Sequence, residues 1–163
     1  LLHAAAALAT QQGASVTIVD LKNYPMPVYC GDIEAATGIP EGTVRLREVF
    51  AQHDAFLVTS PEYNGFFTPL IKNVFDWMSR PHQGVNGGTL WADKRVLMLA
   101  ASPGGNGGVR MFPGLRVYLS NLGFMVLPTQ IGVPFADKVL SENAITDDKI
   151  RTNIHNVIGK LLT

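Results

Sequence analysis

The sequence has a single cysteine, Cys30, among its 163 residues. One cysteine excludes an intramolecular disulfide framework and a cysteine-based metal cluster. None of the four histidines stands at metal-ligand spacing from another, so no metal site is predicted. The residues around Cys30 supply neither a histidine nor a base-orienting group, and we interpret it as an ordinary loop thiol.

The sequence also has no excess of charge of either sign, because thirteen basic residues balance thirteen acidic ones. A neutral chain lacks the electrostatic footprint of proteins that bind nucleic acid or a membrane surface. Its apolar runs, such as residues 96–101, are far shorter than a membrane span, and no basic flank precedes an apolar segment at the N-terminus. We therefore expect a cytoplasmic protein without a nucleic-acid or membrane partner.

What the chain does contain is the composition of an ordinary globular protein. It is 47% hydrophobic and 16% charged, which argues against disorder. Its length fits one domain with a substantial core, and no linker, internal repeat or low-complexity tract divides it. We expect residues 1–163 to form a single domain.

Residues 58–77 organise this domain. They read as the end of a buried strand, a tight turn and a helix that begins near Thr68 and Pro69. A threonine can cap the first turn of a helix, and proline fits the first helical position because its missing N–H would have no partner there. A strand that leads directly into a helix is half of a βαβ unit. On this interpretation the helix has a broad apolar face that includes Leu70, Val74 and Met78.

The turn at residues 61–65 has two interpretations. Ligands of open α/β sheets bind outside the carboxyl ends of the strands, which is where this turn lies. Gly65 lets the backbone approach a ligand closely, and Tyr63 offers a flat apolar ring with a polar tip. The alternative is that Ser-Pro and Asn-Gly only form a turn without a ligand, with Glu62 solvated and Tyr63 covering the edge of the core. The sequence of the turn alone does not decide between these two interpretations.

A longer pattern around this turn carries a family resemblance. The pattern is Ser60-Pro61-Glu62-Tyr63-Asn64-Gly65, followed by Pro69, Lys72-Asn73 and Asp76-Trp77. It resembles the signature of the NADPH-dependent FMN reductases, a family that includes quinone, azo-dye and chromate reductases. The resemblance implies a flavodoxin-like three-layer α/β sandwich with a parallel sheet, FMN as cofactor and NADPH or NADH as co-substrate. It also implies a homodimer or homotetramer.

A second candidate loop follows the buried strand expected at residues 95–101. It holds four glycines within residues 104–108, so its exposed N–H groups can bind the polar edge of a flat ring. A plain strand-to-helix connection and a phosphate cradle are the alternatives, although no Lys-Ser or Lys-Thr completes a Walker motif. The resemblance favours flavin contact. The predicted cofactor-binding residues are Pro61, Glu62, Tyr63, Asn64, Gly65, Ser102, Pro103, Gly104 and Gly105.

The start of the chain departs from the family pattern. Residues 1–12 predict a helix and residues 15–20 a strand, followed by a proline-rich surface connection over residues 21–41. The family has an earlier strand and a phosphate-binding loop, and in the strand order 2-1-3-4-5 that strand lies between the first two strands of this chain. We expect this domain to be N-terminally incomplete, with unpaired backbone groups on the neighbours of the absent strand.

The remaining elements follow from periodicity. We predict helices over residues 44–52, 115–122 and 146–161, the last beginning at Thr146 with Asp147 and Asp148. Residues 55–58 and 95–101 are almost continuously apolar, as strands buried on both faces are. Residues 124–127 read as the last strand, and residues 130–135 as irregular chain.

No Ser-His-Asp set or carboxylate pair falls in the predicted cleft, which disfavours a hydrolase. Flavin chemistry needs only orientation and electrostatics from the protein. We therefore expect a ping-pong oxidoreductase that passes electrons from a nicotinamide to a small acceptor: a quinone, azo compound, free flavin or metal oxyanion. A flavodoxin-type electron carrier is the first alternative, although such carriers are usually acidic. A cofactor-free interaction domain is the second, should the N-terminal loop be truly absent.

Overall fold

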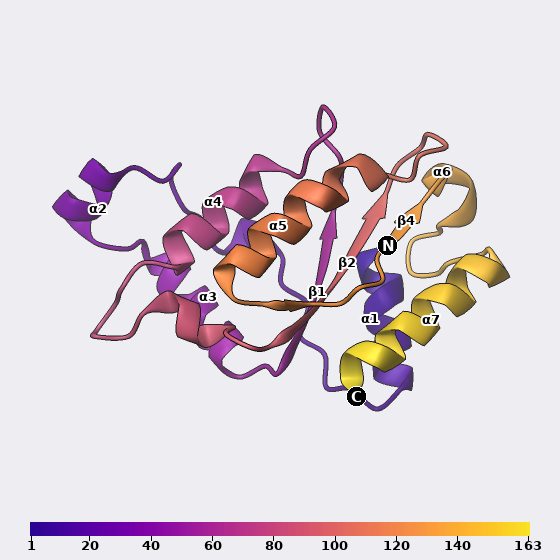
Figure 1. Ribbon diagram of the computed structural model, residues 1–163, viewed down its shortest axis with the longest axis horizontal. Helices are drawn as coiled ribbons and strands as arrows, with labels where there is room; N and C mark the ends of the chain where they lie inside the picture. The colour runs from indigo at the N-terminus through magenta and orange to yellow at the C-terminus, as the bar shows by residue number, and fades with distance from the viewer.

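A parallel sheet forms the centre of the protein, whose computed structural model describes residues 1–163 (Figure 1). The strands are β1 (Ala55–Ser60), β2 (Arg95–Ala101), β3 (Met125–Val126) and β4 (Ile131–Val133). One edge of β2 pairs with β1, from Ala55 opposite Arg95 to Ser60 opposite Ala100. The other edge pairs first with β3 and then with β4. The expected parallel α/β architecture is confirmed.

The helices lie on both faces of this sheet. The helices α3 (Glu41–Ala51), α4 (Pro69–Met78) and α5 (Phe112–Leu122) pack on one face, and α1 (Leu2–Gln11) and α7 (Asp148–Leu162) pack on the other. Alternation along β2 divides the core, because Val96 and Met98 pack toward the first group and Leu97 and Leu99 toward the second. All four are buried, which explains why the strand is apolar throughout.

Shorter elements occupy the connections. They are η1 (Leu21–Asn23), α2 (Gly31–Thr37), η2 (Gly87–Leu90), η3 (Val109–Met111) and α6 (Ala136–Val139). The sequence predicted surface loop where α2 forms, since prolines and glycines flank these seven residues. Two acidic residues in the first turn of α2 oppose the partial positive charge of its N-terminus.

The last strand was predicted with the wrong bounds. Two short strands, β3 and β4, replace the single run at residues 124–127, and β4 lies where irregular chain was expected. Pro128 lies between them and has no N–H to donate to the ladder, which accounts for the interruption. The strand resumes beside the end of β2, next to the second candidate loop.

The start of α5 and the capping of α4 also differ from expectation. α5 begins at Phe112, because Pro113 is compatible with the first turn of a helix. The Thr68 side chain makes no capping bond, although α4 begins after it as predicted. Leu70 is exposed rather than part of the apolar face, whereas Val74 and Met78 are buried.

Polar residues of the family pattern fasten α4 to an extended segment in front of α2. Asn73 Oδ1 accepts from the backbone N–H of Tyr29 at 2.7 Å, and Asn73 Nδ2 donates to the carbonyl of Pro27 at 3.0 Å. Trp77 Nε1 donates to the same carbonyl at 2.8 Å. On the opposite side the Tyr118 hydroxyl of α5 donates to the carbonyl of Lys72 at 3.1 Å. This half of the pattern therefore positions the helix rather than contacting the cleft.

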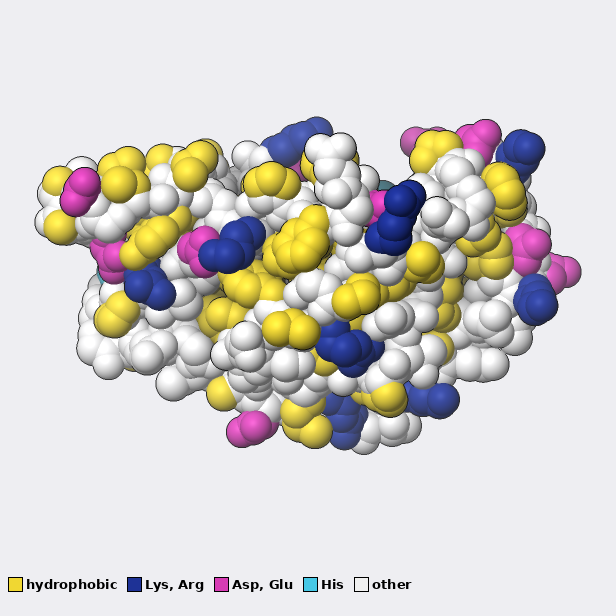
Figure 2. All heavy atoms as spheres, turned by 45° about the horizontal axis from the view of Figure 1, so that its top comes forward, with side chains coloured by type: hydrophobic (Ala, Val, Ile, Leu, Met, Phe, Trp, Pro, Cys, Tyr) yellow, Lys and Arg dark blue, Asp and Glu magenta, His cyan; other side chains and the backbone are white.

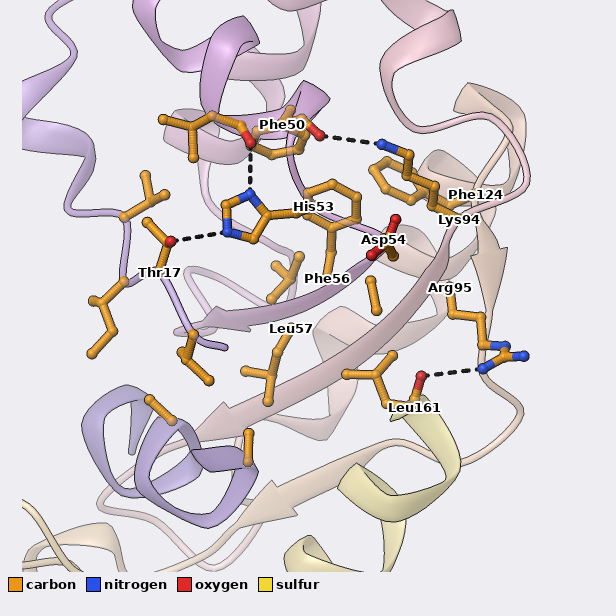
Figure 3. A pocket seen from close by; sticks show the side chains of 18 of the residues that line it. Thr17, Phe50, His53, Asp54, Phe56, Leu57, Lys94, Arg95, Phe124 and Leu161 are labelled. Atoms are coloured by element: carbon orange, nitrogen blue, oxygen red, sulfur yellow. Dashed lines mark hydrogen bonds between the residues drawn. The ribbon is translucent and has the colours of Figure 1, made fainter. Parts of the chain in front are cut away.

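The strand predicted at residues 15–20 does not form. The segment has no strand assignment, and a cavity of about 800 Å³ separates it from β1 (Figure 3). A β-branched run becomes a strand only where a neighbour supplies ladder partners, and none lies against this segment. His53 bridges the gap at one end, donating from Nδ1 to the carbonyl of Val49 at 2.6 Å, with Nε2 2.9 Å from Thr17 Oγ1.

That cavity is mainly apolar. Of its 31 lining residues 22 are hydrophobic, and they come from residues 14–19, from β1 and from the surrounding helices. β1 is paired along one edge only, so its other edge faces this space. That edge of β1 therefore has no strand partner in the structure.

Candidate flavin site

The first candidate loop is a tight turn at the end of β1. The backbone N–H of Tyr63 donates to the carbonyl of Phe66 at 2.9 Å, and the N–H of Phe66 donates back at 3.1 Å. Asn64 and Gly65 between them have φ values of 52° and 82°. Two positive φ values in succession define a type I′ turn, for which Asn-Gly is the preferred pair. The local sequence therefore determines the shape of this loop.

Aromatic packing fixes the turn against α5. The Phe66 ring occupies the space that a side chain at Gly114 would take, since a Cβ there would clash with the ring. Phe66 stacks on Phe67 at 4.6 Å between ring centroids, and Phe67 stacks on Tyr118 at 5.3 Å. Burial and the neighbouring Asp76 raise the pKa of Tyr118 above its ordinary value, so its hydroxyl stays protonated and continues to donate.

The second candidate loop follows β2 and is held by β4. Ser102 donates its backbone N–H to the carbonyl of Val133 at 3.1 Å. Gly107 has a φ of 59°, and a Cβ on it would lie within 2.9 Å of backbone atoms from Gly132 to Pro134. Only glycine permits so close an approach of two backbones. The contact positions the loop at the same edge of the sheet as the first turn.

The two loops enclose a polar hollow of about 230 Å³. An ion pair joins them, with Arg110 Nε 3.1 Å from Glu62 Oε1, and the backbone N–H of Arg110 donates to Glu62 Oε2 at 3.1 Å. Figure 2 looks onto this end of the molecule, where charged and hydrophobic side chains are interspersed. The hollow is lined by Glu62, Ser102, Gly104, Gly105, Asn106, Gly108 and Arg110.

The structure brings together four of the nine predicted residues in this lining: Glu62, Ser102, Gly104 and Gly105. The other five belong to the same two loops but do not line the hollow; they are Pro61, Tyr63, Asn64, Gly65 and Pro103. Tyr63 in particular is 59% exposed, so its ring does not cover the edge of the core. It stands free at the rim of the loop.

Sequence reasoning missed Asn106, Gly108 and Arg110. The signal was present for Arg110, because this basic residue follows the glycine-rich run after only one intervening residue, Val109. Arg80, which follows α4, lies at the end of that helix away from the turn, and its guanidinium packs over the Tyr29 ring at 5.3 Å from the centroid.

The donors of this site match the polar edge of a flavin. The backbone N–H groups of Gly104, Gly105 and Asn106 donate to no acceptor in the protein, and neither do those of Asn64 and Gly65. The pyrimidine edge of FMN presents mainly acceptor oxygens and nitrogens, which such N–H groups satisfy. Nothing lies within 4 Å of a Cβ placed on Gly104. The residues present therefore fit the flavin ring.

A parallel α/β sheet with two polar loops facing one another at its carboxyl edge defines a flavodoxin-like protein. The sequence matches the family described as NADPH-dependent FMN reductase over residues 1–138. The chain belongs to this family. It is accordingly an oxidoreductase that depends on FMN and a reduced nicotinamide.

Named relatives agree with this assignment. A probable NADPH:quinone oxidoreductase of Oryza sativa subsp. japonica is 34% identical over 169 residues, covering 99% of this chain and 81% of its own length. An NAD(P)H-dependent FMN reductase of Pseudomonas aeruginosa is 30% identical over 151 residues, covering 91% and 77%. Among solved structures, a flavoenzyme NAD(P)H:(acceptor) oxidoreductase of Paracoccus denitrificans superposes with a TM-score of 0.74 at 25% identity, covering 99% and 88%.

None of the helices combines the length and apolar character needed to traverse a bilayer.

Proposed function

We propose that the two loops hold the flavin ring and that a small quinone is the electron acceptor. Bound FMN supplies hydride and electron transfer between the nicotinamide and the acceptor. The observation that carries the proposal is the set of free N–H groups on two facing loops at the carboxyl edge of the sheet. A quinone is favoured because the rice relative is named as a quinone oxidoreductase.

The residues of the site have distinct roles in this proposal. Gly104 and Gly105 let the backbone approach the ring, because side chains would separate them from it. The Glu62–Arg110 pair sets the spacing of the two loops and neutralises the carboxylate beside the ring. The exposed Tyr63 packs beside the bound ring and excludes water from one side.

We propose NADPH as the preferred electron donor. We also propose that the protein functions as a homodimer or homotetramer. Large apolar side chains are exposed around the first turn, namely Tyr63, Phe66, Leu70 and Val117. A second copy of the chain would cover such a surface, since exposed apolar patches commonly mark protein contacts. A flavodoxin-type carrier, the second candidate, is disfavoured by a net charge of zero.

The absorption spectrum of the purified protein tests this function. After addition of FMN, we expect flavin bands that bleach with NADPH under anaerobic conditions and recover when a benzoquinone is added. Titration with NADH in parallel measures the donor preference, and azo dye, free flavin and chromate replace the quinone in further runs. A folded protein that takes up no FMN would contradict the proposal. Uptake without bleaching by either nicotinamide would instead favour the carrier.

Asn64→Ala is expected to weaken FMN binding by about tenfold. The substitution removes an amide beside the ring and places alanine in a left-handed conformation, which costs about 1 kcal/mol. Fluorescence titration of FMN measures the change. Asn64→Gly is the matched control, because glycine keeps the turn and removes only the amide. If Asn64→Gly binds FMN as tightly as the unmodified protein, the amide has no role in binding.

A further inference from the structure

Phe135 adopts a conformation that its side chain disfavours. Its φ is 49° and its ψ is 45°, in the left-handed region. A bulky residue there is a genuine outlier, and such strain persists only when the surroundings enforce it. The backbone does so here, because the N–H of Phe135 donates to the carbonyl of Gly104 at 3.2 Å and its carbonyl accepts from Lys138 at 2.8 Å. Glycine or asparagine would meet the same constraint at lower cost.

Burial does not explain why phenylalanine stands at this position. The residue is 48% exposed and belongs to neither core cluster. Its ring lies against the second candidate loop, 3.3 Å from where a Cβ on Gly105 would be. Figure 1 shows α6, which begins directly after Phe135, beside the loop that follows β2. The aromatic ring of a residue with a strained backbone is thus exposed to solvent at the rim of the flavin site.

A cation accompanies this ring. Lys138 Nζ lies 5.6 Å from the ring centroid of Phe135. Lys138 forms none of the four ion pairs of the protein, whereas Arg110, the other cation beside the loop, is paired with Glu62. The rim therefore combines an exposed aromatic face with a cation that has no carboxylate partner.

We propose that Phe135 and Lys138 bind the nucleotide portion of the electron donor, with a base stacked on the ring and a phosphate paired with the ammonium group. This inference rests on the proposed function, since it requires a dinucleotide to reach the flavin. A neutral quinone could use the ring but not the cation, whereas a nucleotide carries both an aromatic base and phosphates. The pair therefore determines affinity for the donor and leaves the acceptor unaffected.

Phe135→Gly tests the ring without disturbing the backbone, because glycine adopts this φ freely. We expect the KM for NADPH and the Kd for 2′,5′-ADP, measured by calorimetry on the FMN-loaded protein, to rise by about tenfold, the effect of losing one stacked base. The Kd for FMN and the KM for the quinone should stay unchanged. Resistance to urea should be equal or higher, since strain is removed.

Lys138→Gln should weaken 2′,5′-ADP binding in the same direction and reduce its dependence on salt. Lys149→Gln, which alters an exposed lysine on the first turn of α7, is the matched control and should change neither quantity.

Two results would overturn the inference. In the first, Phe135→Gly leaves both the KM for NADPH and the Kd for 2′,5′-ADP unchanged while NADPH still bleaches the flavin; the proposed function would then stand without this nucleotide contact. In the second, the Kd for FMN rises together with the Kd for 2′,5′-ADP, which would show that the ring only braces the loop at Gly105. A failure of the proposed function itself is distinct, because the unmodified protein would then show no bleaching.

Discussion

Replacement of Arg47 by methionine is expected to lower the free energy of unfolding by about 3 kcal/mol. Arg47 lies on α3 and is only 6% exposed, yet no carboxylate pairs with it. Its guanidinium instead donates to the carbonyls of Met78 at 2.7 Å, Arg80 at 2.8 Å and Val85 at 3.0 Å. Burial lowers the pKa of Arg47 below its ordinary value, which reflects the cost of removing this charge from water.

Methionine matches the length of the arginine stem but donates no hydrogen bond. The carbonyls of Met78 and Arg80 then lose their partner, whereas that of Val85 keeps the backbone N–H of His82. Urea denaturation measures the loss. Arg45→Met is the control on the same helix, because Arg45 is exposed and makes only one hydrogen bond, to the carbonyl of Asn23 at 2.9 Å, besides an ion pair with Glu41 at 3.8 Å. That variant should change stability by less than about 0.5 kcal/mol. Equal midpoints for the two variants would show that the three bonds do not stabilise the fold.

Gly107→Ala is expected to combine a loss of stability with a loss of flavin affinity. The new Cβ would lie within 2.9 Å of backbone atoms from Gly132 to Pro134, and the φ of 59° disfavours alanine. The second loop must therefore move away from β4, at a cost of about 2 kcal/mol. Displacement of the N–H groups of Gly104 and Gly105 should weaken FMN binding by at least about tenfold.

Gly104→Ala is the matched substitution for the stability measurement, because nothing lies within 4 Å of a Cβ there and its φ is not positive. Its unfolding free energy should stay within about 0.5 kcal/mol of the unmodified protein. Thermal and urea unfolding compare the two variants, and fluorescence titration follows FMN binding by Gly107→Ala. If Gly107→Ala unfolds like Gly104→Ala, the packing of the loop on β4 does not hold the site in place.

The two loops of the candidate site could be predicted because each lies on a short segment. The Asn64-Gly65 pair specifies its turn through φ values that few other pairs adopt, and the glycines after β2 mark the second loop. Contacts between the loops could not be predicted. Arg110 and Glu62 are 48 residues apart, and their pairing depends on the register of β1 against β2.

The sequence by itself determined the parallel α/β class, the helix that follows the first turn and the edge of the sheet at which the two candidate loops lie. Local spacing carries all three, because apolar runs, proline and glycine act within a few residues of themselves. Only the tertiary structure decided that residues 15–20 form no strand, that β4 supports the second loop, and that Phe135 stands beside Gly105. Each of these three outcomes depends on a contact with residues distant in sequence. A strand needs a pairing partner, the second loop needs the backbone of β4, and the position of Phe135 needs Gly105.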